Sequence, residues 1–459
     1  MNAIITAPPH PMLADLIEAR DGCTTSAPRF SDDALALDFT AKHERDLVHV
    51  SEWNRWLHWD GARWVKDRTT MVFDRIRAVC REQAELAKGN DHLAMTLASR
   101  QKVAAVEALA RSDRRHARTA DEFDANPWTL NTPGGTVDLR TGQMREHNRA
   151  ELHTKITAVP PGGDCPRWKA FLREITHGDE PAVAYLQRWA GYMLTGRTDE
   201  HAFIFIYGPG GNGKSVLANT ISGVLGDYAA TAPMETFMAT PNDRHPTEMA
   251  GLRGARLVVA QETEAGRALA EAKIKALTGG DKISARFMRG DFFEFVPQFK
   301  LMMVGNHRPE LKHPDDAMRR RLHLLPLTYR PQAPEPLLAE QLRAEMPGIL
   351  AWAIEGCLIW QLDRLGMAEV VRQASAEYFA EQDVLAQWIA ERTEINAASS
   401  AAASAMFHDW STWAKERGQP PGSLKGFIAE MERLAAKKRT NQGVVFPGIR
   451  LKPSDTGVF

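Results

Sequence analysis

A glycine-rich loop that ends in lysine and serine carries the clearest chemistry of this sequence. Residues 208–215 read GPGGNGKS and match the spacing G-x-x-x-x-G-K-[ST] of a phosphate-binding loop. Glycines let backbone N–H groups converge on phosphate oxygens, and the N-terminus of a following helix favours the same negative charge. Lys214 would then reach the β- and γ-phosphates of ATP, and the Ser215 hydroxyl would ligate Mg²⁺. The predicted nucleotide contacts are Gly208, Pro209, Gly210, Gly211, Asn212, Gly213, Lys214 and Ser215.

The segments on either side of this loop have the apolar patterns that such a loop needs. Residues 202–207 read AFIFIY, a continuous apolar run that is typical of a buried strand. Residues 216–225 carry apolar side chains at helical spacing. Strand, glycine loop and helix together indicate a P-loop NTPase, and the alternative is a glycine-rich turn that binds no nucleotide.

Acidic residues follow a second apolar strand, as they do in a Walker B motif. Residues 256–264 read RLVVAQETE, and the acids come where the strand ends. One carboxylate at such a position holds Mg²⁺ or its water, and a neighbouring one polarises the attacking water. Glu262, which follows the strand directly, is the first choice for both tasks, and Glu264 is the second candidate. The alternative is a solvated strand end.

A third apolar strand ends in a polar residue, and a cluster of arginines comes shortly after it. Residues 299–305 read FKLMMVG and are followed by Asn306, which is placed to bind the lytic water or the γ-phosphate, the role called sensor 1. Arginines then stand at 319, 320 and 321. In ring ATPases an arginine at this point reaches the nucleotide of the neighbouring subunit and stabilises the charge of the transition state. A solvated basic cluster is the alternative.

A β-hairpin is expected between the second and third strands. Two alternating segments within residues 277–295 meet at the turn sequence Arg-Gly-Asp. The arms and tip carry Lys282, Arg286 and Arg289. A cationic hairpin in the centre of a ring would grip the phosphates of a threaded strand, whereas the alternative is that these cations only keep an exposed hairpin soluble.

This ordered set of motifs resembles the superfamily 3 helicases, and more closely the helicase portion of phage and plasmid primase-helicases related to the poxvirus type. The resemblance rests on the block at residues 121–142, on YLQRWAGYMLTG, GPGGNGKS, VVAQETE, LTGGD and FKLMMVGN, and on the pair Arg320-Arg321. It implies an AAA+-like α/β core, a preceding mainly helical domain and a C-terminal winged helix. It also implies a hexameric, ATP-driven DNA helicase that moves 3′ to 5′ and replicates a phage, prophage or plasmid. Arg320 becomes the first choice for the arginine finger and Arg321 the second.

The expected domains follow from this resemblance and from local composition. They are a loosely ordered lead at 1–45, a mainly helical domain at 46–195, the ATPase core at 196–332, a helical segment at 333–385 and a winged-helix-like DNA-binding domain at 386–459. The low-complexity run NAASSAAASA at 396–405 is expected to be a linker or the start of a helix. The lead is too short for a polymerising domain, so priming is expected to need a separate primase or polymerase.

Two clusters before the motor have a structural and a functional interpretation. Tryptophans recur between residues 53 and 64 around Asp60-Gly61, which predicts a small β-meander whose aromatic side chains pack together, with base stacking as the alternative. Arginines stand at 111, 114, 115 and 118 at the end of a region that is expected to be helical. A solvated helix face explains them most simply, and a DNA contact is the alternative.

Composition sets limits on the remaining possibilities. A hydrophobic content of 44% and a charged content of 25% are ordinary for a soluble protein, and no apolar run approaches the roughly 18 residues of a membrane span. The net charge of −1 means that DNA binding must come from local basic patches. Four cysteines without a C-x-x-C pair favour neither zinc nor disulfides and fit a reducing cytosol, here the cytoplasm of a bacterial host.

Three functions remain open at this point. The leading hypothesis is a helicase that acts on single-stranded and forked DNA as a homo-hexamer. The second is a DNA-bound ATPase that serves as replication initiator or loader without processive unwinding. The third, a small-molecule P-loop kinase, leaves the arginines, the hairpin and the winged helix unexplained.

Overall fold

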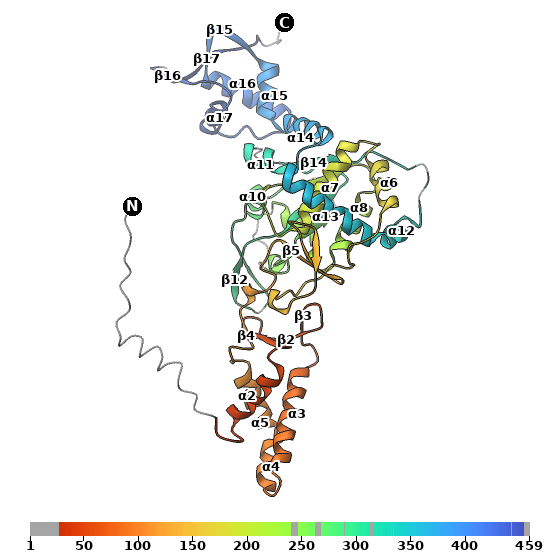
Figure 1. Ribbon diagram of the computed structural model, residues 1–459. Coiled ribbons are helices and arrows are strands. Elements are labelled where there is room, and N and C mark those ends of the chain that lie inside the picture. The colour runs from red at the N-terminus through yellow and green to blue at the C-terminus, as the bar shows by residue number, and fades with distance from the viewer. Residues whose placement is uncertain are drawn as a thin grey trace, which may run out of the picture. The chain divides into compact units, whose positions relative to one another are not determined.

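The computed structural model describes residues 27–239, 247–261, 268–288, 290–311, 315–331, 333, 335–441 and 443–453 (Figure 1). The chain divides into two compact units. The smaller unit runs to Gly162 and includes Val224–Tyr228, and the larger unit contains the remainder.

The smaller unit begins with a group of helices around an apolar core. Its helices are α2 (Asp32–His43), α3 (Met71–Leu86), α4 (Asp91–Leu97) and α5 (Arg100–Ala110). Ser31, Asn90 and Ser99 start three of them, because each side chain accepts a hydrogen bond from a backbone N–H of the first turn. Phe39, Ile76 and Val106 are fully buried where the helices meet. The region before the arginine cluster, which was expected to be helical, is confirmed as the three helices α3, α4 and α5.

Two small sheets complete this unit. One has the order β3-β2-β1-β4 and the other β5-β6-β7. Their strands are β1 (Leu47–Val50), β2 (Arg55–Trp59), β3 (Trp64–Lys66), β4 (Ala117–Arg118), β5 (Thr129–Thr132), β6 (Gly135–Asp138) and β7 (Gln143–Arg145). Trp56 and Trp64 are buried, and their indoles donate to Glu107 at 2.8 Å and to the carbonyl of Arg149 at 3.0 Å. The predicted meander is confirmed. Trp56 packs in the core of the helices, and Trp64 packs in a separate cluster with Val48 and Leu57.

The arginine cluster that follows α5 is largely engaged within the protein. Arg111 pairs with Glu107 at 2.6 Å, and Arg115 pairs with Asp113 at 2.7 Å. Arg118 donates to the backbone carbonyls of Arg114 and Ala117. These contacts support the interpretation of the cluster as a solvated face.

The larger unit is built on a five-stranded sheet with the order β14-β8-β13-β10-β9. The strands are β8 (Phe203–Tyr207), β9 (Ala229–Pro233), β10 (Leu257–Gln261), β13 (Lys300–Gly305) and β14 (Leu322–Pro326). Every pairing between them is parallel. Parallel strands with continuous apolar runs are buried on both faces, as the strand patterns predicted. The predicted α/β core is confirmed.

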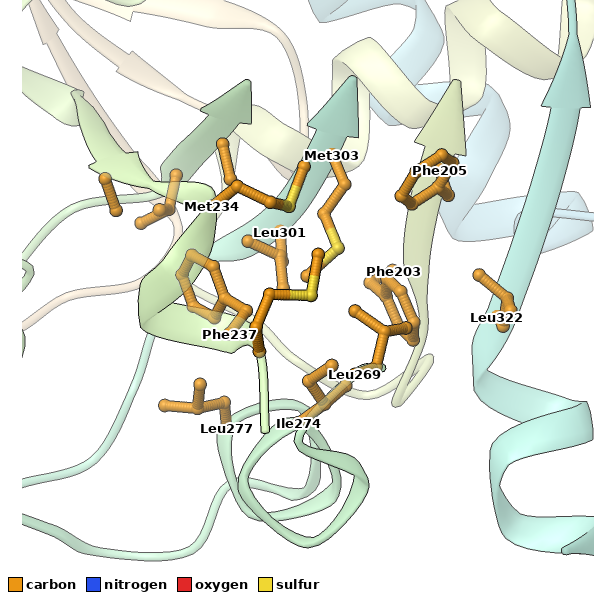
Figure 2. Close-up of a cluster of buried hydrophobic side chains, with 14 of the residues drawn as sticks. Phe203, Phe205, Met234, Phe237, Leu269, Ile274, Leu277, Leu301, Met303 and Leu322 are labelled. Carbon is orange, nitrogen blue, oxygen red and sulfur yellow. The ribbon is translucent and has the colours of Figure 1, made fainter. Parts of the chain in front are cut away.

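Alternating side chains of the sheet pack against different elements. Figure 2 shows Phe203 and Phe205 of β8 beside Leu301 and Met303 of β13, with Ile274 of helix α10 (Glu271–Gly279) below them. Side chains at the intervening strand positions lie on the other face of the sheet and contact the helices there. There His323 of β14 lies 2.7 Å from the Tyr185 hydroxyl of helix α7 (Glu180–Leu194), and burial lowers the pKa of His323 to about 4.

Further helices of this unit are α6 (Pro166–Ile175), α8 (Lys214–Leu225), α9 (Thr247–Ala250), α11 (Asp316–Arg321), α12 (Leu338–Ala344), α13 (Met346–Asp363) and α14 (Glu369–Gln382). The α7 and α13 backbones touch directly. A Cβ atom on Gly191 would lie 2.0 Å from the Cys357 amide nitrogen, and one on Gly356 would lie 2.1 Å from the Gln187 carbonyl oxygen. Only glycine permits this approach, so these residues set the helix spacing.

Two buried cations join the end of α7 to the sheet. Arg256 donates to the Leu194 carbonyl at 2.6 Å, and Lys300, at the start of β13, donates to the carbonyl of Thr195. The C-terminal end of a helix is partially negative, which favours positive charge there. Burial lowers the pKa of Lys300 well below its ordinary value. The helix before the motor is thereby held at the base of the sheet.

The C-terminal part contains α15 (Val384–Arg392), β15 (Thr393–Ala402), α16 (Ala403–Glu416), α17 (Leu424–Met431), β16 (Lys438–Thr440) and β17 (Gly443–Leu451). The three strands form an antiparallel sheet with the order β15-β17-β16. The expectation of a linker or helix start at residues 396–405 was wrong for residues 396–402, which are strand, and is confirmed for the last three residues, where α16 begins at Ala403. Small residues do not indicate a strand locally. The strand partner is β17, which pairs with residues 393–395 and 400–402.

The hairpin predicted before the third strand is also present. Strands β11 (Ile283–Arg286) and β12 (Phe292–Phe295) pair antiparallel. None of the helices that the structure describes is long and apolar enough to cross a lipid bilayer.

The contact between α7 and α13 leads to a stability prediction. Gly191→Ala should lower the free energy of unfolding by about 1–3 kcal/mol or more, because the added methyl group overlaps the α13 backbone. Denaturant unfolding monitored by circular dichroism measures the change. Gly251→Ala is the control, since its nearest neighbouring atom would lie 3.9 Å away. Equal losses of unfolding free energy in the two variants would show that α7 and α13 can move apart without an energetic cost.

Candidate nucleotide site

The glycine-rich loop joins β8 to α8, as predicted, and it is packed closely on two sides. Gly208 and Gly213 have φ angles of 149° and 86°, which favour glycine. A Cβ on Gly208 would lie 2.0 Å from the Leu327 carbonyl oxygen, and one on Gly213 would lie 2.8 Å from the Ile175 side chain. The loop therefore runs between the end of α6 and the segment that follows β14.

Lys214 lies inside this loop and is only 6% exposed. Its ammonium donates to the carbonyls of Gly208 at 2.7 Å and Pro209 at 2.9 Å, and to the Asn212 side chain at 2.8 Å. Asn212 in turn donates to the Leu327 carbonyl. Burial lowers the Lys214 pKa. A phosphate group would offer this ammonium full negative charge in place of neutral acceptors, so the loop is suited to a polyphosphate.

A magnesium ion bound through ATP is compatible with the residues present. Ser215 is the second residue of α8 and is exposed. Mg²⁺ in such sites takes most of its ligands from phosphates and water, so one hydroxyl and one carboxylate are enough protein ligands. Glu262 and Glu264, which were predicted to supply the carboxylate, lie outside the described residues.

The sheet brings the other predicted residues to the edge at which the loop begins. Gly305 pairs with Tyr207, and Gln261 pairs with Val304. Because the three strands are parallel neighbours, the phosphate loop, Asn306 and the end of β10 at Gln261 lie at the same edge of the sheet. Asn306 is exposed there. The Gln261 side chain donates to Asn219 of α8 at 3.2 Å, which links the second strand to the loop helix.

The three predicted arginines have different environments on α11. The helix begins at Asp315, whose carboxylate accepts from the Met318 amide at 2.9 Å. Arg319 lies 3.4 Å from Asp383 and above the Phe379 ring. Arg321 donates to the Ala317 carbonyl at 3.1 Å. Arg320 is the exposed member of the cluster.

One group beside the phosphate loop was missed from the sequence. His177 follows α6 with a left-handed φ of 54°, and its Nε2 lies 3.0 Å from the Thr328 hydroxyl. Its ring also meets the Tyr329 ring edge-on, with centroids 5.7 Å apart. His177 and Thr328 come shortly after Ile175 and Leu327, the residues against which Gly213 and Gly208 of the loop pack. No spacing in the sequence links two segments so far apart in the chain.

The predicted hairpin cations lie on a separate element from the loop. Lys282 stands 3.9 Å from Glu294, and the Arg286 guanidinium lies 4.8 Å above the Phe292 ring. Arg289 lies outside the described residues. The hairpin is thus confirmed, while its cations are accompanied by acidic and aromatic neighbours.

Two family models match this chain. The model described as "D5 N terminal like" matches residues 36–177, and a family of unknown function, DUF5906, matches residues 206–321. The first match covers most of the smaller unit with α6, and the second runs from the end of β8 to the end of α11.

Relatives with similar sequences are viral proteins named "Putative helicase". Those of Acanthamoeba polyphaga mimivirus, Frog virus 3 and Invertebrate iridescent virus 6 are 29%, 25% and 30% identical to this chain. The similar stretches cover 44%, 62% and 49% of this chain, but only 22%, 32% and 24% of those proteins. The chain therefore spans about a third or less of these relatives.

Solved structures of the NrS-1 C-terminal region share the fold. Two of them align with TM-scores of 0.50 and 0.51 at 8% identity, and they cover 87% and 91% of this chain. The alignments include 94% and 99% of those chains. Such low identity shows the fold alone. The D5 match and the viral relatives, taken separately from this fold, confirm the resemblance to the D5-type helicases that the motifs indicated.

Proposed function

We propose that this protein is an ATP-dependent DNA helicase that works as a hexameric ring with 3′–5′ polarity. The observation that carries the proposal is the strand order β8-β13-β10, which brings the phosphate loop, Asn306 and the end of β10 at Gln261 to one sheet edge. The relatives named as helicases support the unwinding of DNA as the use of this site.

In this proposal the phosphates of ATP bind on the loop, and Mg²⁺ is held by Ser215 and Glu262. Lys214 contacts the β- and γ-phosphates in place of its present carbonyl acceptors. Glu262, with Glu264 as the second candidate, orients the attacking water, and Asn306 binds that water or the γ-phosphate. A Mg²⁺ ion held by these residues would neutralise negative charge on the phosphates.

The ring completes the site from the neighbouring subunit. Arg320 is exposed on α11, a helix whose N-terminus is capped by Asp315. In the ring it would reach the nucleotide across the subunit boundary. Arg321 is the second candidate for this arginine finger. A site that needs a second copy requires an oligomer, and the resemblance to ring helicases makes that oligomer a homo-hexamer in this proposal.

DNA would be held by two elements. The β11–β12 hairpin, with Lys282, Arg286 and Arg289, would contact single-stranded DNA in the channel. The C-terminal domain would act as a winged helix, in which α16 and α17 are followed by the β16–β17 pair. Lys438 and Arg439 of that pair are exposed.

The biological setting of this proposal comes from the resemblance to phage and plasmid primase-helicases. The protein would replicate a phage, prophage or plasmid in the cytoplasm of a bacterial host, with a separate primase or polymerase. A second function, an initiator or loader that does not unwind processively, is favoured by the exposed basic pair of the C-terminal domain, which suits an anchor on duplex DNA. Strand displacement on a forked duplex distinguishes the two functions.

The phosphate loop gives the first test. Lys214→Ala should abolish ATP hydrolysis, because the β- and γ-phosphates lose their cation. DNA binding without nucleotide should persist. Phosphate release and single-strand binding measure the two activities, and Lys88→Ala, which removes a surface ion pair with Glu85, is the control. Hydrolysis near the wild-type rate in the Lys214 variant would rule out the loop as the catalytic site.

The acidic residues give the second test. Glu262→Gln should bind ATP and fail to hydrolyse it, since the change removes charge from the metal and water site but keeps the side-chain size. Equilibrium binding of a fluorescent ATP analogue and steady-state turnover separate the two steps. Full turnover in Glu262→Gln with loss in Glu264→Gln would reverse the assignment.

The arginine finger gives the third test. Arg320→Ala should keep ATP binding and reduce hydrolysis by about 10³-fold or more. Mixing this variant with Lys214→Ala should restore part of the activity, because mixed interfaces then contain one intact loop and one intact arginine. Arg321→Ala is measured in parallel. A monomer with full activity would contradict the ring.

A further inference from the structure

The hairpin of β11 and β12 exposes large apolar side chains at its free end. Phe287, Met288 and Phe292 are 53%, 80% and 61% exposed. Exposed apolar side chains that gather on one element mark a binding surface more often than chance. The other end of the hairpin is anchored, since Phe295 is buried in the core of the larger unit and Phe293 packs against that core.

The exposed rings are also held in place by their neighbours. Phe287 stacks on Phe293 with centroids 5.5 Å apart and planes inclined by 26°. The Arg286 guanidinium lies 4.8 Å above the Phe292 ring, and the Arg253 guanidinium lies 5.3 Å above that of Phe293. These contacts restrict the rings before any ligand binds, which lowers the entropy cost of binding.

Charge alone gives this hairpin little attraction for DNA. Between residues 281 and 295 the sequence has three cationic and three acidic residues. The cations are Lys282, Arg286 and Arg289, and the acids are Asp281, Asp291 and Glu294. Lys282 lies 3.9 Å from Glu294, so the positive charge of this hairpin cation is partly neutralised by a neighbouring carboxylate. A purely electrostatic grip on phosphates would need a surplus of positive charge.

We propose that the hairpin binds single-stranded nucleic acid by stacking bases on Phe287 and Phe292, with its cations in a supporting role. Every base has an aromatic face, so stacking tolerates any sequence, as a translocating motor requires. Arginines beside the rings can meet the phosphate that accompanies each stacked base. This combination favours a nucleic-acid strand over an apolar protein surface. The inference rests on the proposed DNA-binding function and changes its mode of contact.

The test compares a normal single strand with an abasic strand of the same length and charge. Wild-type protein should bind the abasic strand more weakly. Phe287→Ala and Phe292→Ala should each weaken binding to the normal strand by about fivefold to a hundredfold, the range for one stacked base. They should change binding to the abasic strand little, and Phe287→Trp should retain most of the affinity. Fluorescence anisotropy measures all of these.

Salt dependence separates stacking from charge. The two Phe→Ala variants should keep the wild-type slope of log affinity against log salt, whereas Lys282→Ala should reduce that slope. Met95→Ala, which removes an exposed apolar side chain in the smaller unit, is the matched control and should change neither quantity. Unchanged thermal unfolding shows that the variants are folded.

Other outcomes overturn the inference. Wild-type affinity in both Phe→Ala variants, or an equal loss on normal and abasic strands, would exclude base stacking. A change in solution mass with unchanged DNA affinity would show that the rings form an interface between copies of the chain. Absence of any single-strand binding by the wild-type protein would refute the proposed function itself, which distinguishes the two failures.

Discussion

The backbone hydrogen bonds between β8 and β13 hold together the two halves of the candidate nucleotide site. The phosphate loop follows β8 and Asn306 follows β13, and the pairing of Tyr207 with Gly305 places both at one edge of the sheet. β10 pairs on the far side of β13, and its last residue, Gln261, lies at the same edge. Any change in the order or direction of these strands would separate the loop from the residues proposed to act on its nucleotide.

Packing outside the sheet then determines the shape of the loop. Gly213 lies against Ile175 of α6, while Gly208 and Asn212 meet the Leu327 carbonyl beyond β14. α6 is itself fixed by Glu345, whose two carboxylate oxygens accept the Arg167 and Trp168 amides at 2.9 Å. Segments before and after the motor thus support the loop from both sides. This packing fixes the shape of the loop that we propose binds phosphate.

In the β11–β12 hairpin, the neighbours of the basic side chains change how these cations are interpreted. Read alone, its cations suggest a grip on phosphates, yet acidic residues match them in number. What the fold exposes at the tip is aromatic surface, with Phe287 and Phe292 more than half accessible. In the arginine cluster after α5 the outcome is different, because Arg111 and Arg115 are paired with acids and leave the surface simply solvated.

Local sequence was enough to predict the parts whose signal lies within a few neighbouring residues. The spacing of GPGGNGKS, the apolar runs that became β8, β10 and β13, and the turn between β11 and β12 are signals of this kind. Only the tertiary structure decided where distant segments meet. Residues 400–402 became strand because β17 pairs with them, and Gly191 is needed because the α13 backbone passes beside it. The physical reason is that hydrogen-bond pairing and close packing depend on the partner, which local composition does not contain.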